Sequence, residues 1–124
     1  MKEIIAKLNN YRASPRKTRI VADLVKGKKV KDAIVQLDFL TKKSANPIAK
    51  LLKSAISNAR NDFNVADENN LTVKKIIVNS GTVLKRSRPR SRGMANQILK
   101  RTSNITIVLG EQSQNKKSNL KSKK

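Results

Sequence analysis

The sequence predicts one small domain that mixes strands with helices and carries a long, basic two-stranded arm. Its 124 residues leave room for a single core. Apolar residues alternate as in strands near the N-terminus and again after residue 70, and between these segments they recur every three or four residues. No Asp or Glu occurs from Asn69 through Gly110, although Lys and Arg recur there. The arm is therefore expected at Leu71–Leu109, on a base formed by the rest of the chain.

Charge dominates the composition. The chain has 29 Lys and Arg against 8 Asp and Glu, a net charge of +21, so it repels itself unless a partner supplies anions. Apolar residues make up 37% of the chain, below the roughly 45–50% of ordinary globular proteins. Because no cationic helix carries the aromatic anchors of membrane-surface helices, nucleic acid is the favoured partner and a membrane surface the weaker alternative.

Histidine and cysteine are both absent. The chain therefore lacks disulfides, the usual zinc ligands and the commonest proton carrier at neutral pH, and we expect neither a metal nor a cofactor. The absence of disulfides suits a reducing compartment. The N-terminal MKEIIAKLNN has too short an apolar run for a signal peptide, and no run approaches the about 20 apolar residues of a membrane-spanning helix. These features predict a soluble cytosolic protein.

The first two elements are a strand and a helix. Residues Met1–Tyr11 alternate between apolar and polar, which predicts a half-buried strand with Ile5 as the exception. Ser14 followed by Pro15 is a strong helix start, because a serine hydroxyl can cap free amides and proline suits the first helical position. The helix should end at Gly27. Its predicted apolar face consists of Ile20, Val21, Leu24 and Val25.

Arg16 and Lys17 lie in the first turn of this helix, where the positive end of the helix dipole disfavours cations. Local stability does not explain them. A phosphate bound at this helix end would explain both side chains, since free amides and two cations would then converge on it. The alternative is that both charges are simply solvated.

Two further helices should complete the base. After a basic linker, Lys28–Lys31, we expect a short helix at Asp32–Leu40 and a longer one at about Ser44–Asn61. Their apolar residues recur at helical spacing, so the longer helix should be the central core helix. Its predicted core residues are Ile48, Leu51, Leu52, Ala55, Ile56 and Ala59. The acidic, Asn-rich stretch Asp62–Asn70 is expected to be a loop.

The two strands of the arm should differ along their length. On the returning strand, the near portion from Ile105 onward should lie on the core. On the outgoing strand, Asn79–Gly81 allows a bulge or bend, and few later residues could contribute to a core. Fully extended, the arm would reach roughly 60 Å, so most of its outer part must leave a globule of about 13 Å radius of gyration. Residues 112–124 form a low-complexity basic tail that we expect to be disordered without a partner.

The residues favour nucleic-acid binding over catalysis. Eight scattered carboxylates, with no His or Cys, offer no nucleophile–base pair and no metal cage, and the glycine patterns of nucleotide-binding loops are missing. Alternating arginines at 86, 88, 90 and 92 would share one face of an extended chain, with Pro89 and Gly93 favouring a bend. Arginine binds phosphate bidentately and stacks on exposed bases. Because aromatics are scarce, binding should depend on phosphate, shape and arginine, with strong salt dependence.

Four motifs closely resemble the family of protein twenty-two of the bacterial large ribosomal subunit. They are YRASPRKTRIVADLVKGKKV from Tyr11, KSAISNA from Lys53, KRSRPRSRG from Lys85 and ILKRTSNITIV from Ile98. The similarity runs in order from about Ile4 to Leu109, and four motifs at family spacing make it specific. The sequence departs from the family pattern at Ser91, Met94, Asn96 and Gln97, in the tip and on its returning side.

The resemblance implies an α+β domain over residues 1–111: a three-stranded antiparallel sheet packed on three helices, with a long protruding β-hairpin. It implies a structural role in the large subunit of the cytoplasmic ribosome, early assembly of that subunit, and no enzymatic activity. The implied partners are large-subunit rRNA, neighbouring large-subunit proteins and, in passing, the nascent peptide, with no membrane and no homo-oligomer. The hairpin, about residues 71–109 with its tip at about 84–97, would line the exit tunnel for the nascent peptide.

The resemblance and the basic motifs together assign two sets of site residues, with no catalytic and no metal-binding residue. The expected rRNA-binding residues are Arg12, Ser14, Arg16, Lys17, Arg19, Lys26, Lys28, Lys29, Lys85, Arg86, Arg88, Arg90, Arg92, Lys100 and Arg101. The expected tunnel-lining tip consists of Leu84, Lys85, Arg86, Ser87, Arg88, Pro89, Arg90, Ser91, Arg92 and Gly93.

An alternative is a DNA-bending nucleoid protein with a basic β-arm, in which a proline at the tip wedges between base steps. Such proteins are usually dimers with a large apolar interface, for which this chain has scarcely enough apolar surface.

Overall fold

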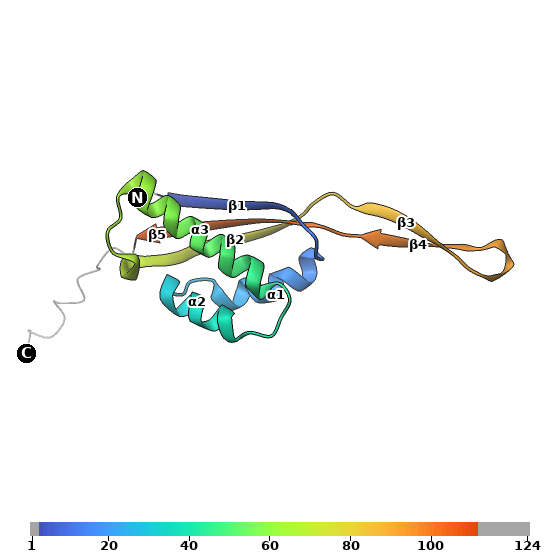
Figure 1. Ribbon diagram of the computed structural model, residues 1–124, viewed down its shortest axis with the longest axis horizontal. Coiled ribbons are helices and arrows are strands. Elements are labelled where there is room, and N and C mark those ends of the chain that lie inside the picture. The colour runs from blue at the N-terminus through green and yellow to red at the C-terminus, as the bar shows by residue number, and fades with distance from the viewer. Residues whose placement is uncertain (1–2, 112–124) are drawn as a thin grey trace, which may run out of the picture.

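The computed structural model describes residues 3–111, which form a three-stranded antiparallel sheet, three helices and a long arm (Figure 1). The strands are β1 (Glu3–Tyr11), β2 (Leu71–Ser80), β3 (Leu84–Pro89), β4 (Ala95–Lys100) and β5 (Ser103–Glu111), and the helices are α1 (Pro15–Val25), α2 (Val30–Phe39) and α3 (Ala45–Phe63). The predicted fold class is confirmed. Within these residues, no helix is long and apolar enough to cross a bilayer. The predicted tail, residues 112–124, lies outside the described residues.

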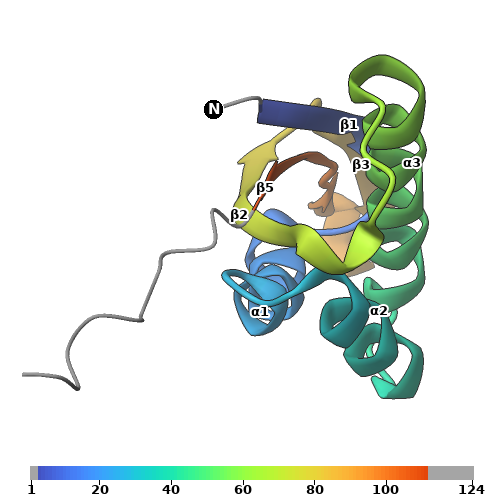
Figure 2. The ribbon, with the colours of Figure 1, turned by 90° about the vertical axis from the view of Figure 1, so that its left-hand side faces the viewer.

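The sheet has the order β1-β5-β2, so the returning strand of the arm is its central strand. Figure 2 looks along the long axis and shows the three helices gathered round one side of the sheet. Cross-strand neighbours repeat the alternation predicted for β1: Ala6 lies opposite Ile107, and both are buried. Ile5 is 47% exposed on the other face. The sheet therefore has one face on the core and one open face, as antiparallel sheets commonly do.

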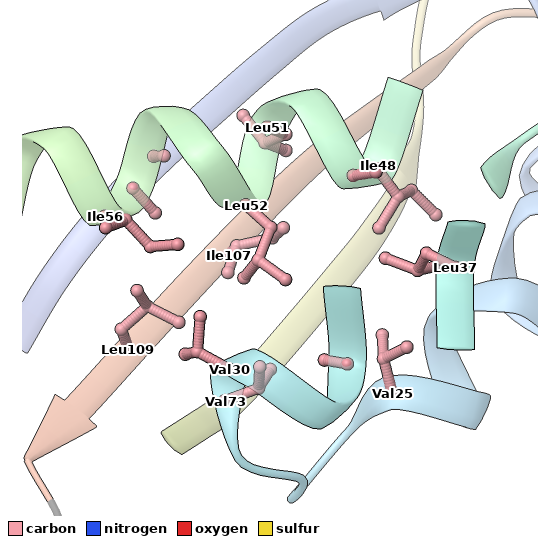
Figure 3. Close-up of a cluster of buried hydrophobic side chains, with 14 of the residues drawn as sticks. Val25, Val30, Leu37, Ile48, Leu51, Leu52, Ile56, Val73, Ile107 and Leu109 are labelled. Atoms are coloured by element: carbon pink, nitrogen blue, oxygen red, sulfur yellow. The ribbon is translucent and has the colours of Figure 1, made fainter. Parts of the chain in front are cut away.

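The core lies between α3 and this inner face (Figure 3). All six apolar residues predicted for the core face of α3 are buried, and Figure 3 shows Leu52 of α3 close to Ile107 of β5. Burying each such aliphatic side chain contributes about 1.5–3 kcal/mol. Pro47 lies in the first turn of the helix, where its missing amide loses no hydrogen bond. The helix ends at Asn64, whose left-handed backbone (φ 50°) closes the last turn.

α1 has the predicted start but a different buried face. Its buried residues are Pro15, Thr18, Val21, Ala22 and Val25. Ile20 and Leu24, which the sequence predicted to be inward, are 56% and 38% exposed, so that prediction was wrong. α1 packs mainly against β2, and the small residues Thr18 and Ala22 are on its buried side instead.

The predicted cap of α1 is also wrong in its chemistry. Ser14 stands at the N-cap position, but within the described residues its hydroxyl makes no capping hydrogen bond. Its carbonyl instead accepts bonds from the amide (3.1 Å) and hydroxyl (3.0 Å) of Thr18. The start of α1 therefore depends on Pro15, whose fixed φ suits the first helical position, and on Thr18.

α2 begins two residues before the predicted start, because Val30 belongs to the core and not to a basic linker. The connection before it joins the sheet edge: the Gly27 amide donates to the Val73 carbonyl, and the Val73 amide donates to the Lys28 carbonyl, both at 2.9 Å. β2 has a bulge next to this contact, between Val73 and Lys75. The sequence had predicted a bulge or bend only at Asn79–Gly81.

The arm divides into two halves. Its inner half is the pairing of β2 with β5 inside the three-stranded sheet, and its outer half, the outer arm, is the separate β3–β4 pair at residues 84–100. The strands break at Gly81–Val83 and Arg101–Thr102, next to the predicted bend; we call this break the neck. Every residue of β3 and β4 is exposed, and the outer arm projects from the globule, as predicted (Figure 1).

Candidate nucleic-acid interface

The outer arm has two unequal faces. Cross-strand partners share a face, so Arg86 with its partner Ile98, Arg88 with Asn96, and Lys100 with Leu84 lie on one side. The opposite face carries Lys85, Ser87, Pro89, Ala95, Gln97 and Leu99. Three cations thus lie on one face and a single cation on the other. The two faces can therefore meet different surroundings: an anionic one and a nearly neutral one.

The tip of the arm has the bend that Pro89 and Gly93 predicted. The turn spans Arg90–Met94, closed by a hydrogen bond of 2.8 Å from the Arg90 amide to the Met94 carbonyl. Arg92 has a left-handed backbone (φ 62°) in this bend, so it leaves the alternation that Arg86 and Arg88 follow in the extended strand. Pro89 pairs with Ala95 within the β3–β4 ladder. It is therefore not at the extreme tip, where a proline wedge between base steps would have to be.

The neck is held by hydrogen bonds between segments far apart in the sequence. The Gly81 amide donates to the Thr102 carbonyl at 2.9 Å, and the Thr102 hydroxyl donates to the Thr82 carbonyl at 2.7 Å. From the other side, Arg12 donates to the Arg101 carbonyl at 2.8 Å, and the Ser103 hydroxyl donates to the Ala13 carbonyl at 2.7 Å. The loop between β1 and α1 therefore holds the returning strand where it leaves the core.

A groove of about 560 Å³ lies beside the neck, between α1, the link from α2 to α3, and the returning strand of the arm. We call it the base groove. No acidic side chain lines it among the described residues. A hollow with cations from three segments attracts polyanions, because their fields add. The cations that line the base groove are Arg12, Lys17, Lys42, Lys43 and Arg101.

The structure thus brings together three predicted residues, Arg12, Lys17 and Arg101, which are separated by up to 89 positions. Lys42 and Lys43, which also line the groove, were not among the predicted binding residues. The sequence feature that could have indicated them is a pair of lysines between two predicted helices with no acidic residue next to the pair. Ser14 also lines the base groove, next to the predicted phosphate position at the start of α1.

Other predicted residues lie elsewhere. Arg16 is exposed on the first turn of α1, and Lys26, Lys28 and Lys29 lie beyond the other end of that helix, about 15 Å along its axis. Lys28 donates a hydrogen bond to the Gln36 side chain. The cations of β3, the tip and β4 lie out along the arm (Figure 1). Their roles in binding stay predictions.

Arg19 has a structural contact that explains its position. Its Nε and Nη2 both donate to the Val78 carbonyl, at 3.1 and 3.0 Å, and so join α1 to β2. The carbonyl lies near the end of β2, two residues before the last residue of that strand. A guanidinium in this position stabilises the base from which the arm leaves. In the described part of the chain, His, Cys, Asp and Glu form no group of three or more that could hold a metal ion.

Two comparisons with known proteins bear on this arrangement. The family model described as ribosomal protein L22p/L17e matches residues 6–110, which include the sheet, the three helices and the whole arm. The chain is also 52% identical over 110 residues to the large ribosomal subunit protein uL22 of Mesoplasma florum, an alignment that covers 89% of this chain and 97% of that protein. The chain belongs to the ribosomal protein L22p/L17e family.

Proposed function

We propose that this protein is a structural constituent of the large subunit of the cytoplasmic ribosome, where it binds large-subunit rRNA and supports early assembly of that subunit. One observation carries the proposal beyond family membership: the arm places its cations on a hairpin without a core of its own, and an isolated two-stranded hairpin is at best marginally stable in water. A polyanion that packs against the arm supplies both the missing contacts and the missing negative charge.

The two faces of the outer arm suggest how it lies in the exit tunnel. The face with Arg86, Arg88 and Lys100 would contact rRNA phosphates. The opposite face, with Ser87, Pro89 and Gln97, would be turned to the nascent peptide. A surface with a single cation suits that position, because peptides of any charge must pass without being held. Neighbouring large-subunit proteins would be the remaining partners.

The base would anchor the protein to the rRNA, and the arm would extend into the exit tunnel. Residues 1–111 act in this proposal as one rRNA-binding unit, present as a single copy and not as a homo-oligomer, and the role is structural and not catalytic. The site residues divide accordingly between base and arm. Arg12, Lys17 and Arg101 at the base groove would bind backbone phosphates, and Leu84–Gly93 would line the exit tunnel.

Fractionation of ribosomes tests the proposal. The protein should stay with large subunits after a salt wash, and its absence from washed large subunits would show that the proposal is wrong. Two variants then separate base from arm. Deletion of residues 85–97 should leave rRNA binding by the base measurable, whereas the charge-neutralising combination Lys42→Gln with Lys43→Gln should lower rRNA affinity and reduce its dependence on salt.

The DNA-bending alternative makes the opposite prediction in one measurement. Proteins of that kind are dimers, so sedimentation of the purified protein should show a stable dimer if the alternative holds and a monomer if the ribosomal proposal holds.

A further inference from the structure

The base groove contains more than cations. Two aliphatic side chains also line it: Ile20 from α1 and Leu99 from β4 of the outer arm. The Ile20 side chain is 56% exposed and the Leu99 side chain is 40% exposed, so neither is covered by other residues of the chain. Buried Val21 and Ser44 line the same hollow. The groove is therefore part apolar and part strongly basic.

This combination restricts the chemistry of a ligand. A phosphate alone would satisfy the cations but leave Ile20 and Leu99 in water, at a cost of about 25 cal/mol per Å² of apolar surface that could otherwise be covered. The backbone of a regular RNA duplex has the same shortcoming, because its bases are stacked inside. A nucleotide pulled out of the base stack can satisfy both parts of the groove. Its flat, weakly polar base can cover the aliphatic side chains, and the phosphate on each side can meet the cations.

The groove also has a suitable size. Its volume of about 560 Å³ is more than a phosphate group requires. It falls within the about 300–1,000 Å³ of pockets that hold small organic ligands. Flipped bases are held between apolar or aromatic side chains in the proteins that bind them. This chain has almost no aromatics, and aliphatic walls take their place here.

We propose that the base groove binds one unstacked nucleotide, from a bulge or single-stranded stretch of RNA, with its base against Ile20 and Leu99 and its flanking phosphates at the surrounding cations. This inference rests on the proposed function and names the form of RNA that the site takes. Because Ile20 belongs to the base and Leu99 to the outer arm, the bound nucleotide touches both and ties the arm to the base.

The test uses the full chain with labelled methyl groups, observed by NMR. A short single-stranded RNA should shift the methyl signals of Ile20 and Leu99. A duplex RNA of the same phosphate concentration, and inorganic phosphate, should leave these two signals nearly unchanged while shifting signals near the lysines. Equal shifts of both methyl groups with duplex or with inorganic phosphate would overturn the proposal, because only phosphate binding would remain.

A matched pair of variants gives a second measurement. Leu99→Ser should weaken binding of the single-stranded RNA by about tenfold, the size of one lost base contact. Val35→Ser is the control, because Val35 is an aliphatic side chain of α2 that is 55% exposed and does not line the base groove. Neither residue belongs to the core, so both variants should fold. Equal losses in the two variants, or no loss in either, would contradict the proposal.

The two proposals can fail separately. If the protein is missing from salt-washed large subunits, the ribosomal function fails, whatever the NMR measurement shows. If the protein is present there but single-stranded RNA does not reach Ile20 and Leu99, only the unstacked nucleotide is excluded.

Discussion

The inner and outer halves of the arm each pair an outgoing strand with a returning strand in the same antiparallel way, but their surroundings differ. In the inner half, alternate residues such as Ile105 and Val73 are fully buried beneath the helices. In the outer half, every residue of β3 and β4 is exposed. The hydrogen-bond ladder continues through both halves apart from the neck. The comparison therefore separates backbone pairing, which the halves share, from apolar burial, which only the inner half has.

This difference shows what each half depends on. Net hydrogen bonding contributes little per bond to stability, about 0.5–1.5 kcal/mol, because water offers the same bonds to the unfolded chain. Burial of aliphatic side chains contributes most of the remaining stability, and among the four strands of the arm only β2 and β5 bury such side chains. The inner half can be stable by itself, and the outer half needs a partner. The neck lies at the boundary, and its four hydrogen bonds hold the arm where burial ends.

Amide hydrogen exchange of the free protein should show the largest contrast. Amides of β5 from Ile105 to Leu109 should exchange only by global unfolding, whereas those of β3 and β4 should exchange by local opening, orders of magnitude faster. The measurement is residue-resolved exchange by NMR. Similar protection in the two halves would mean that the outer arm is stable without a partner and that the contrast drawn from burial is wrong.

Two identical substitutions sharpen the same comparison. Ile105→Ala removes a side chain that is fully buried in β5, and it should lower the free energy of unfolding by about 2–5 kcal/mol. Ile98→Ala makes the same chemical change in β4, where the side chain is 42% exposed. It should change the free energy of unfolding by less than about 0.5 kcal/mol. Urea unfolding followed by circular dichroism measures both. A cost for Ile98→Ala near that of Ile105→Ala would contradict the division of the arm.

The neck should be sensitive to one added methyl group. A Cβ on Gly81 would lie 2.4 Å from the Thr102 hydroxyl oxygen, which donates to Thr82. Gly81→Ala should therefore destabilise the protein by about 1–3 kcal/mol and speed amide exchange of the outer arm. In a Thr102→Ala background the same change should cost less, because the nearest atom is gone. An equal cost in both backgrounds would show that the clash is not the cause.

The smallest expected effect concerns an ion pair on the open face of the sheet, whose contribution to stability depends on pH. The Lys74 ammonium donates a hydrogen bond to the Glu3 carboxylate and attracts it, so the pKa of Glu3 lies below its ordinary value. Because the folded pKa is lowered, the pair stabilises the protein above the unfolded pKa of about 4.3 and this contribution is lost as pH falls through the lower folded value. Glu3→Gln should remove this part of the acid unfolding curve.

A double-mutant cycle isolates the pair. Lys74→Gln should have the same small effect as Glu3→Gln, and the combination should add nothing. Because both side chains are exposed, the effect should also shrink at high salt. Additive losses in the double variant would show that the two residues act independently.

The sequence predicted most of the fold because its signals are periodic. Six core positions of α3, the inward face of β1 and the buried end of β5 all follow from spacing, and all are confirmed. The family resemblance added the three-stranded antiparallel sheet packed on three helices and the protruding hairpin. Errors occurred where neighbours decide the outcome: α1 buries Thr18 and Ala22 in place of Ile20 and Leu24, and Ile20 is left exposed beside a groove.

The sequence by itself determined the charge of this protein, its elements and the absence of acids along the arm, because each of these is a property of neighbouring residues. Only the tertiary structure decided where the cations meet. Arg12 reaches Arg101 across 89 positions, and Lys42 and Lys43 join them from a link between helices. No local pattern can show such a meeting, because it depends on how the helices pack on the sheet. The division of the arm arises in the same way, since the core ends where the helices end.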